Sequence, residues 1–122
     1  MDFEYRDMAT IKDKSSALLL FEESAKEQEL ATELGDYKKG NKNYFNIVKA
    51  INALKEQGEL LALLDFLNHP SIGVRGLAAC YLLPVRENEA IEALELISQQ
   101  TGIHALTART TLSEWRNGNL KF

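Results

Sequence analysis

Apolar residues recur at intervals of three and four along nearly the whole chain, and no stretch alternates strictly between apolar and polar residues. Two prolines and seven glycines interrupt this pattern. The pattern predicts an all-α protein. We expect six helices joined by short turns, at residues 13–34, 42–57 and 59–67, around Arg75 up to Pro84, and at residues 88–100 and 103–116.

The helix around Arg75 is apolar almost all round, and Arg75 is its one charged residue. Such a helix belongs in the middle of a helical stack. An ionised guanidinium in that setting must find a carboxylate or backbone carbonyls, so we expect Asp65 or Glu95 as its partner and a structural role for it. Gly76 and Ala108 are expected to mark close contacts between helices, where larger side chains would be destabilising.

The last four predicted helices resemble two copies of one helix pair. Equivalent positions are thirty residues apart: Leu64 and Leu94, Leu67 and Ile97, Ala78 and Ala108, Leu82 and Leu112. Repeats of about this period are typical of helical solenoids, in which each pair covers the open face of its neighbour. Three antiparallel pairs are therefore expected, with a plain helix bundle as the alternative. The length of 122 residues fits one domain, residues 1–122.

Residues 60–83 resemble a HEAT repeat. The likeness rests on the apolar first helix, the loop with Pro70 and the residues Val74, Arg75, Ala78, Ala79 and Leu82 of the second helix. Residues 59–120 are similar to a family of small bacterial HEAT-like domains. The resemblance implies a HEAT-like α–α superhelix, and some members resemble immunity proteins that neutralise toxins. The chain departs from the repeat at the loop position that often carries Asp, which holds Ser71 or Ile72 here.

Composition indicates the cellular location and the class of partner to expect. No stretch approaches the roughly 18 apolar residues that cross a bilayer, and the first seven residues are too polar and acidic for a signal peptide. We therefore expect a cytoplasmic protein that does not bind membranes. The net charge of −4 disfavours nucleic acid as the main partner and leaves basic proteins open.

Candidate chemistry is sparse. The two histidines, His69 and His104, lack the Glu-x-x-His spacing of helical metal sites, and Cys80 lies within the apolar helix. Glycine-rich phosphate loops, paired cysteines and nucleophile-elbow motifs are absent from the sequence. We expect no enzyme activity, no cofactor and no metal.

The expected function is therefore non-catalytic binding of a protein partner, one form of which is an immunity-type protein against a basic toxin. Two surfaces are candidates: the acidic face of the first helix, with Glu22, Glu29 and Glu33, and a groove around Arg86, Glu89 and Arg109. Solvation of the helix is the more common role of such an acidic face, and it is the simpler interpretation of these residues.

A nucleic-acid-binding or repair domain is the alternative, since HEAT-like DNA glycosylases exist. Its candidate site is the segment 37–44, where Tyr37 and Tyr44 flank Lys38, Lys39 and Lys42. The same residues also fit an ordinary loop between helices, with Gly40 at its turn.

Overall fold

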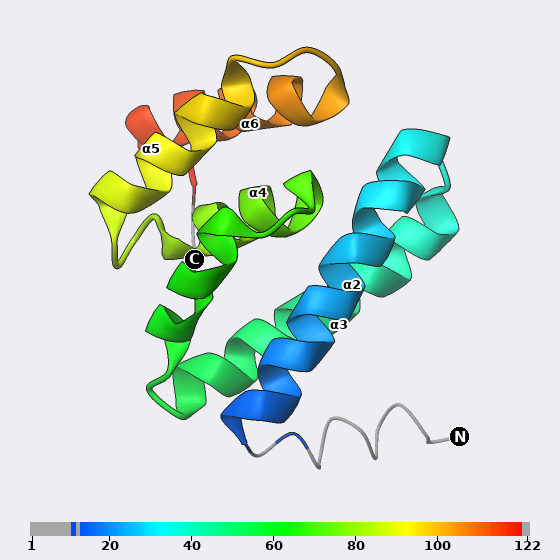
Figure 1. The fold of residues 1–122 in the computed structure, drawn as a ribbon, viewed down its shortest axis with the longest axis vertical. Coiled ribbons are helices and arrows are strands. Elements are labelled where there is room, and N and C mark those ends of the chain that lie inside the picture. Colours follow the sequence, from blue (N-terminus) through cyan, green and yellow to red (C-terminus); the bar gives the residue numbers. More distant parts are fainter. Residues whose placement is uncertain (1–10, 12, 121–122) are drawn as a thin grey trace. The chain divides into compact units, whose positions relative to one another are not determined.

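A computed structural model of the chain describes residue 11 and residues 13–120. These residues form five α-helices and one 3-10 helix with no β-strand among them, which confirms the all-α prediction (Figure 1). The elements are α2 (Lys14–Leu34), α3 (Tyr37–Glu56), the 3-10 helix η1 (Leu60–Asn68), α4 (Ile72–Leu82), α5 (Glu87–Ser98) and α6 (Ile103–Arg116).

The chain divides into two compact units, Met1–Ala62 and Leu63–Phe122. The first contains the α2–α3 hairpin and the second contains α4, α5 and α6. The boundary falls inside η1. A single domain over residues 1–122 stays a prediction, as does the grouping into three HEAT-like pairs.

A tight turn joins α2 to α3. Gly35 ends α2 in the left-handed conformation, with φ 71°, and its N–H bonds back to the carbonyls of Ala31 and Thr32. Asp36 then caps α3, its carboxylate accepting the N–H of Lys39 at 3.1 Å. The second helix therefore begins at Tyr37 and not at Lys42 as expected. The cap of Asp36 extends the helix through Gly40, which the sequence had suggested as a loop residue.

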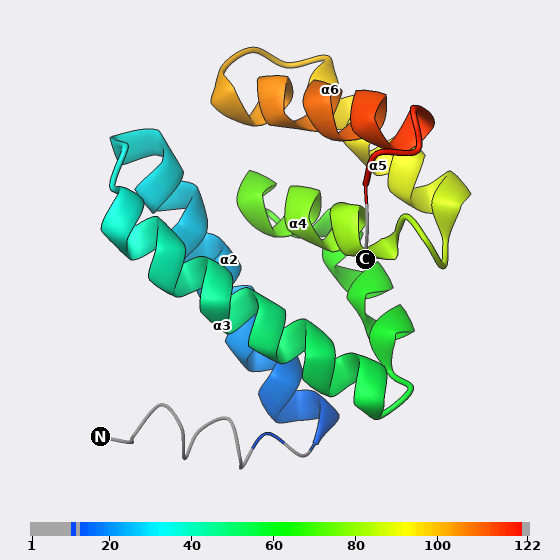
Figure 2. The same ribbon diagram turned by 180° about the vertical axis from the view of Figure 1, so that it is seen from behind.

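The residues of α2 that are buried in the hairpin are mostly small. Its two helices run antiparallel and side by side in both views (Figures 1 and 2). The buried residues of α2 are Ala17, Phe21, Ser24, Ala25 and Ala31. On α3 the fully or almost fully buried large side chains are Ile47, Ile51 and Leu54. At Gly40 an added Cβ would lie 3.7 Å from the side-chain amide of Gln28, an ordinary van der Waals distance, so the packing there does not require glycine.

The second unit is built on α5. This helix packs against both α4 and α6, and α4 also contacts α6 (Figure 2). The core of this unit consists mainly of residues spaced at three and four along each helix: Val74, Ala78 and Leu82 on α4; Ala90, Leu94 and Ile97 on α5; Ala105, Ala108 and Leu112 on α6. The predicted repeat positions of α4, α5 and α6 are therefore all buried.

The third helix differs from the prediction because it is a 3-10 helix. Bonds from Ala62 N to Glu59 O (3.0 Å) and from His69 N to Phe66 O (3.1 Å) flank it. Of its residues only Leu63 is buried, while Leu64 and Leu67 are half-buried. The thirty-residue repeat is thus less exact in the first helices of the two predicted pairs. The fifth helix also begins at Glu87, before the expected cap Asn88.

Substitution of Gly76 tests the packing of α4 against α5. A Cβ at Gly76 would lie 3.7 Å from Ile97 Cδ1, an ordinary van der Waals distance. An alanine therefore fits, contrary to the expectation that any larger residue is harmful here. Because alanine has the higher helix propensity, Gly76→Ala should raise the free energy of unfolding by about 0.5–1 kcal/mol, measured by urea denaturation. A loss of stability would mean that α4 and α5 pack more tightly than described.

Candidate binding surfaces

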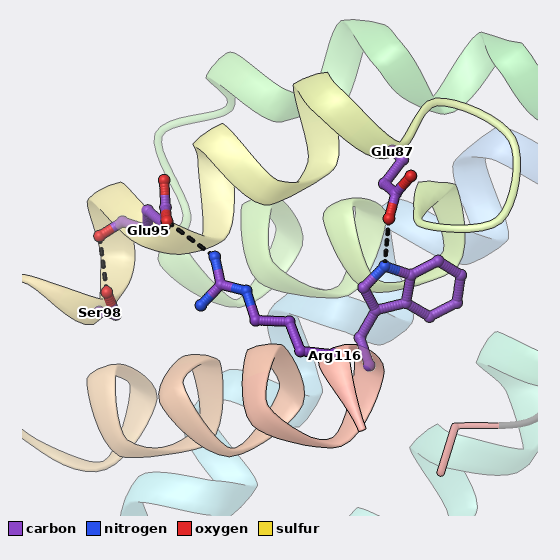
Figure 3. Close-up of polar contacts among 5 residues, drawn as sticks. Glu87, Glu95, Ser98 and Arg116 are labelled. Carbon is purple, nitrogen blue, oxygen red and sulfur yellow. Dashed lines mark hydrogen bonds and ion pairs between the residues drawn. The ribbon is translucent and has the colours of Figure 1, made fainter. Parts of the chain in front are cut away.

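Two side-chain contacts tie α6 to the two ends of α5 (Figure 3). Near the C-terminal end of α5, Arg116 Nη2 donates to Glu95 Oε2 at 2.9 Å. At the N-terminal end, Trp115 Nε1 donates to Glu87 Oε2 at 2.8 Å. Both contacts are exposed, so each contributes little to stability. Trp115 itself is half-buried, consistent with packing between the helices.

A surface cavity of about 400 Å³ lies between α5 and α6. Its polar lining includes Glu95, Ser98, Arg109 and Arg116. Arg109 Nη1 donates to the carbonyl of Ser98 at 2.7 Å, and the Ser98 hydroxyl donates to the carbonyl of Glu95 at 2.7 Å. Both arginines of this cavity therefore already bond to α5, which makes the cavity part of the packing between the two helices.

The three residues of the predicted groove do not form one cluster. Arg86 and Glu89 form an ion pair at the start of α5, whereas Arg109 bonds to Ser98 at its end. Ser98 follows Glu89 by nine residues, about 14 Å along the helix axis. The hydrogen bond from Arg86 lowers the pKa of the exposed Glu89 carboxyl below its ordinary value. A partner-binding role for these residues stays a prediction.

The three acidic residues of the other predicted surface do share one stripe of α2, since Glu22, Glu29 and Glu33 are seven and four residues apart. Glu33 is exposed, whereas Glu22 and Glu29 are half-buried. None of the three is without a partner within the molecule. Their role in binding also stays a prediction.

Sequence reasoning missed an apolar surface on α2. Large exposed side chains occur at Leu19 (55% exposed), Leu30 (54%) and Leu34 (81%). They lie on the same side of the helix as exposed charged residues, at spacings of three and four. We call this surface the outward face of α2; it consists of Leu19, Glu23, Lys26, Glu27, Leu30, Glu33 and Leu34. The signal in the sequence was a helix with leucines on the side opposite its buried alanines.

The predicted nucleic-acid segment lies on α3 and its side chains are exposed. Tyr37 is 85% exposed and Tyr44 59%, and Lys38, Lys39 and Lys42 are also exposed. Lys39 pairs with Glu27 of α2 at 3.8 Å. The segment is therefore helical and is not the loop that the simpler interpretation had suggested.

Arg75 does not pair with Asp65 or Glu95, so the predicted carboxylate partner is wrong, whereas the alternative, backbone carbonyls, is confirmed. Its Nη1 donates to the carbonyls of His69 (2.8 Å) and Pro70 (3.1 Å) in the loop before α4. Glu95 instead pairs with Arg116. Among the described residues no carboxylate forms an ion pair with Arg75. Because its side chain is half-buried, carbonyls suffice where a deeply buried charge would need a carboxylate.

A second surface cavity, of about 390 Å³, lies beside Arg75. On one side the lining includes His69, Pro70 and Arg75, and on the other Ala93, Leu96 and Ile97 of α5. The loop side is held in place by local bonds. The Ser71 N–H donates to His69 Nδ1 at 2.9 Å, and the Ser71 hydroxyl accepts the N–H of Val74 at 3.2 Å as the cap of α4.

The remaining candidate groups offer little chemistry. Burial raises the pKa of the Cys80 thiol to about 11, so it is neutral and a poor nucleophile near neutral pH. Within the described part of the chain, no three His, Cys, Asp or Glu side chains gather as a metal site would require. The helices of that part include none long and apolar enough to span a membrane.

Comparison with known proteins supports the fold. No protein-family model matches the chain, and no curated protein matches its sequence. Among solved structures, the chain is similar to the crystal structure of the protein RPA1889 from Rhodopseudomonas palustris CGA009. The TM-score is 0.82 at 25% sequence identity, and the match covers 90% of this chain and 93% of that chain. The all-helical fold is thus shared over nearly the full length of both chains.

Removal of the Arg75 side-chain charge tests its structural contribution. Arg75→Met keeps the aliphatic part of the side chain and removes two charge-assisted bonds to exposed or half-buried carbonyls. We expect a loss of about 1–2 kcal/mol in the free energy of unfolding, measured by urea denaturation. A loss of about 3–5 kcal/mol, typical of a broken buried ion pair, would show that Arg75 has a carboxylate partner after all.

Proposed function

We propose that the protein is a non-catalytic interaction module of HEAT-like helical pairs that binds another protein in the cytoplasm. The observation that carries this proposal is the outward face of α2, where Leu19, Leu30 and Leu34 are each more than half exposed. Scattered exposed leucines are common on protein surfaces, but these three lie on one side of one helix, Leu30 and Leu34 one turn apart and Leu19 eleven residues before Leu30. Amphipathic faces of this kind are typical of helix surfaces that dock onto a partner.

The charges of the same surface indicate the nature of the partner. Glu23, Glu27 and Glu33 lie among the leucines, with Lys26 as the one cation. A partner with an apolar patch rimmed by Lys or Arg would match both features. An immunity-type role, in which the partner is a basic toxin, is one form of this proposal. The acidic residues Glu22 and Glu29 would extend the attractive field beside the contact.

The exposed aromatic and basic residues of α3 favour a second candidate function, the binding of single-stranded nucleic acid. The sequence of α3 contains five lysines, at positions 38, 39, 42, 49 and 55, and one acidic residue, Glu56. Exposed Tyr37 and Tyr44 lie seven residues apart and could stack on bases. A salt-sensitive mobility shift with single-stranded DNA or RNA, lost in Tyr37→Ala and Tyr44→Ala, would favour this candidate over protein binding.

Polar substitution of the outward leucines should abolish partner binding. In the double variant Leu30→Ser and Leu34→Ser, we expect at least a tenfold loss of affinity, because exposed apolar anchors account for much of the energy of an interface. The measurement is affinity capture of the full chain from native-cell extract, with bound proteins quantified by mass spectrometry. The melting temperature should change little, since both side chains are exposed.

Leu106→Ser is the matched control, because Leu106 is 57% exposed on α6. The proposal predicts one protein that is captured by the wild type and the control and is lost from the double variant. If every captured protein is retained by the double variant, the outward face of α2 is not the binding surface.

Charge reversal on the same face should slow association. Glu23 and Glu33 are exposed, so Glu23→Lys with Glu33→Lys alters the field with little effect on folding, whereas Glu22 and Glu29 are half-buried and are less suitable. With the captured partner, surface plasmon resonance should show a lower association rate for this variant and for the wild type at high salt. An association rate that is indifferent to both changes would contradict a basic partner.

A further inference from the structure

Only some of the N–H donors of the Arg75 guanidinium form hydrogen bonds within the protein. An arginine side chain has five N–H donors, and Nη1 supplies the bonds to His69 and Pro70. Within the described chain, Nε and Nη2 donate to no protein acceptor and no carboxylate neutralises the charge. The edge formed by Nε and Nη2 is one of the two edges of a guanidinium that bind a carboxylate through two parallel hydrogen bonds.

The position of this guanidinium is fixed by the fold. Its two carbonyl partners belong to the loop that ends in the Ser71 cap of α4, and the cap and the His69 ring are bonded to each other through the Ser71 backbone. The donors that remain are therefore held in place before any ligand arrives. A preorganised donor loses little conformational entropy on binding.

Arg75 also lines the cavity of about 390 Å³ beside α5. That volume is within the range of small-ligand pockets, at its lower end. The α5 side of the cavity is mainly aliphatic, with Ala93, Leu96 and Ile97, and Gln100 just after the helix adds one polar side chain. Leu96 is 61% exposed although it lies at this wall, so covering it would remove further apolar surface from water. One charged donor against an aliphatic wall is an arrangement suited to an amphipathic anion.

We propose that this cavity binds a carboxylate carried on a short aliphatic group, with the carboxylate on Arg75 and the aliphatic part against Leu96 and Ile97. Two sources share this chemistry: a free branched or straight-chain carboxylic acid, and the C-terminal residue of a peptide that ends in Leu, Ile or Val. The site shares no residue with the outward face of α2, and the proposal does not rest on the protein-binding function proposed above.

Three probes test the chemistry by NMR titration of the full chain labelled with ¹⁵N. N-acetyl-leucine represents a peptide end, 4-methylpentanoate represents a free acid, and N-acetyl-leucinamide has the same aliphatic group without the charge. We expect at least one of the two acids to shift the amide resonances of residues 69–75 and 93–97, with a dissociation constant in the millimolar range. The neutral amide should bind at least tenfold more weakly. The acid that binds more tightly identifies the source.

Two variants and one control test the location. Arg75→Met should weaken binding of the acids at least tenfold. Ala93→Leu leaves Arg75 intact and fills the cavity, so it should have the same effect if Arg75→Met proves poorly folded. Leu106→Ser, outside the cavity, should bind as the wild type does. Equal binding of acid and amide, full affinity in the Ala93→Leu variant, or no shifts with either acid would each overturn the proposal.

Discussion

The closure of the α2–α3 hairpin is the constraint on which the account of function depends. Four of the five buried residues of α2 are alanine or serine, and Phe21 is the exception. Small residues allow two helices to approach closely, so the hairpin closes without any of the larger aliphatic side chains of α2 in its buried set. Leu19, Leu30 and Leu34 are consequently left on the opposite side of the helix, in water. The proposed binding surface is therefore the side of α2 opposite the one that packs against α3.

In the second unit, the contacts of Arg75 that stabilise the fold also determine which of its donors are left for the proposed ligand. The side chain connects the loop at His69 and Pro70 to α4, which fixes the loop beside α5. Carbonyls can order a guanidinium but do not neutralise it. The bonds that hold the loop therefore also leave a positive charge at the wall of a cavity whose opposite side includes Ala93, Leu96 and Ile97. A structural role for Arg75 and a ligand-binding role are compatible, because different nitrogen atoms serve them.

Much of the fold followed from periodicity. The bounds of α2 and α6, the buried positions Ala78, Leu82, Leu94 and Leu112, and the partial burial of Cys80 all follow from apolar spacing, because amphipathic helices carry a strong signal. The start of α3 was mistaken because Gly40 suggested a turn, whereas the Asp36 cap already begins the helix. The 3-10 form of η1 could not be foreseen, since a short apolar run fits either kind of helix.

The candidate sites were harder to predict than the fold. The acidic stripe of α2 was visible in the sequence, but the exposed leucines beside it were not singled out, because they alternate with charged residues on the same side of the helix. Likewise, Arg86 and Arg109 were grouped by charge, and only the structure shows that they lie at opposite ends of α5. The carbonyl partners of Arg75 also depend on a loop geometry that side-chain patterns do not encode.

Photocrosslinking in the native cell tests the central claim, that the outward face of α2 contacts a protein partner, most directly. A photoreactive residue is placed at position 34 in one strain and at position 106 in another, both exposed sites, and the irradiated adducts are identified by mass spectrometry. The account predicts a discrete covalent adduct with one protein from position 34 and none of the same kind from position 106. No adduct at position 34, or the same set of adducts from both positions, would contradict it.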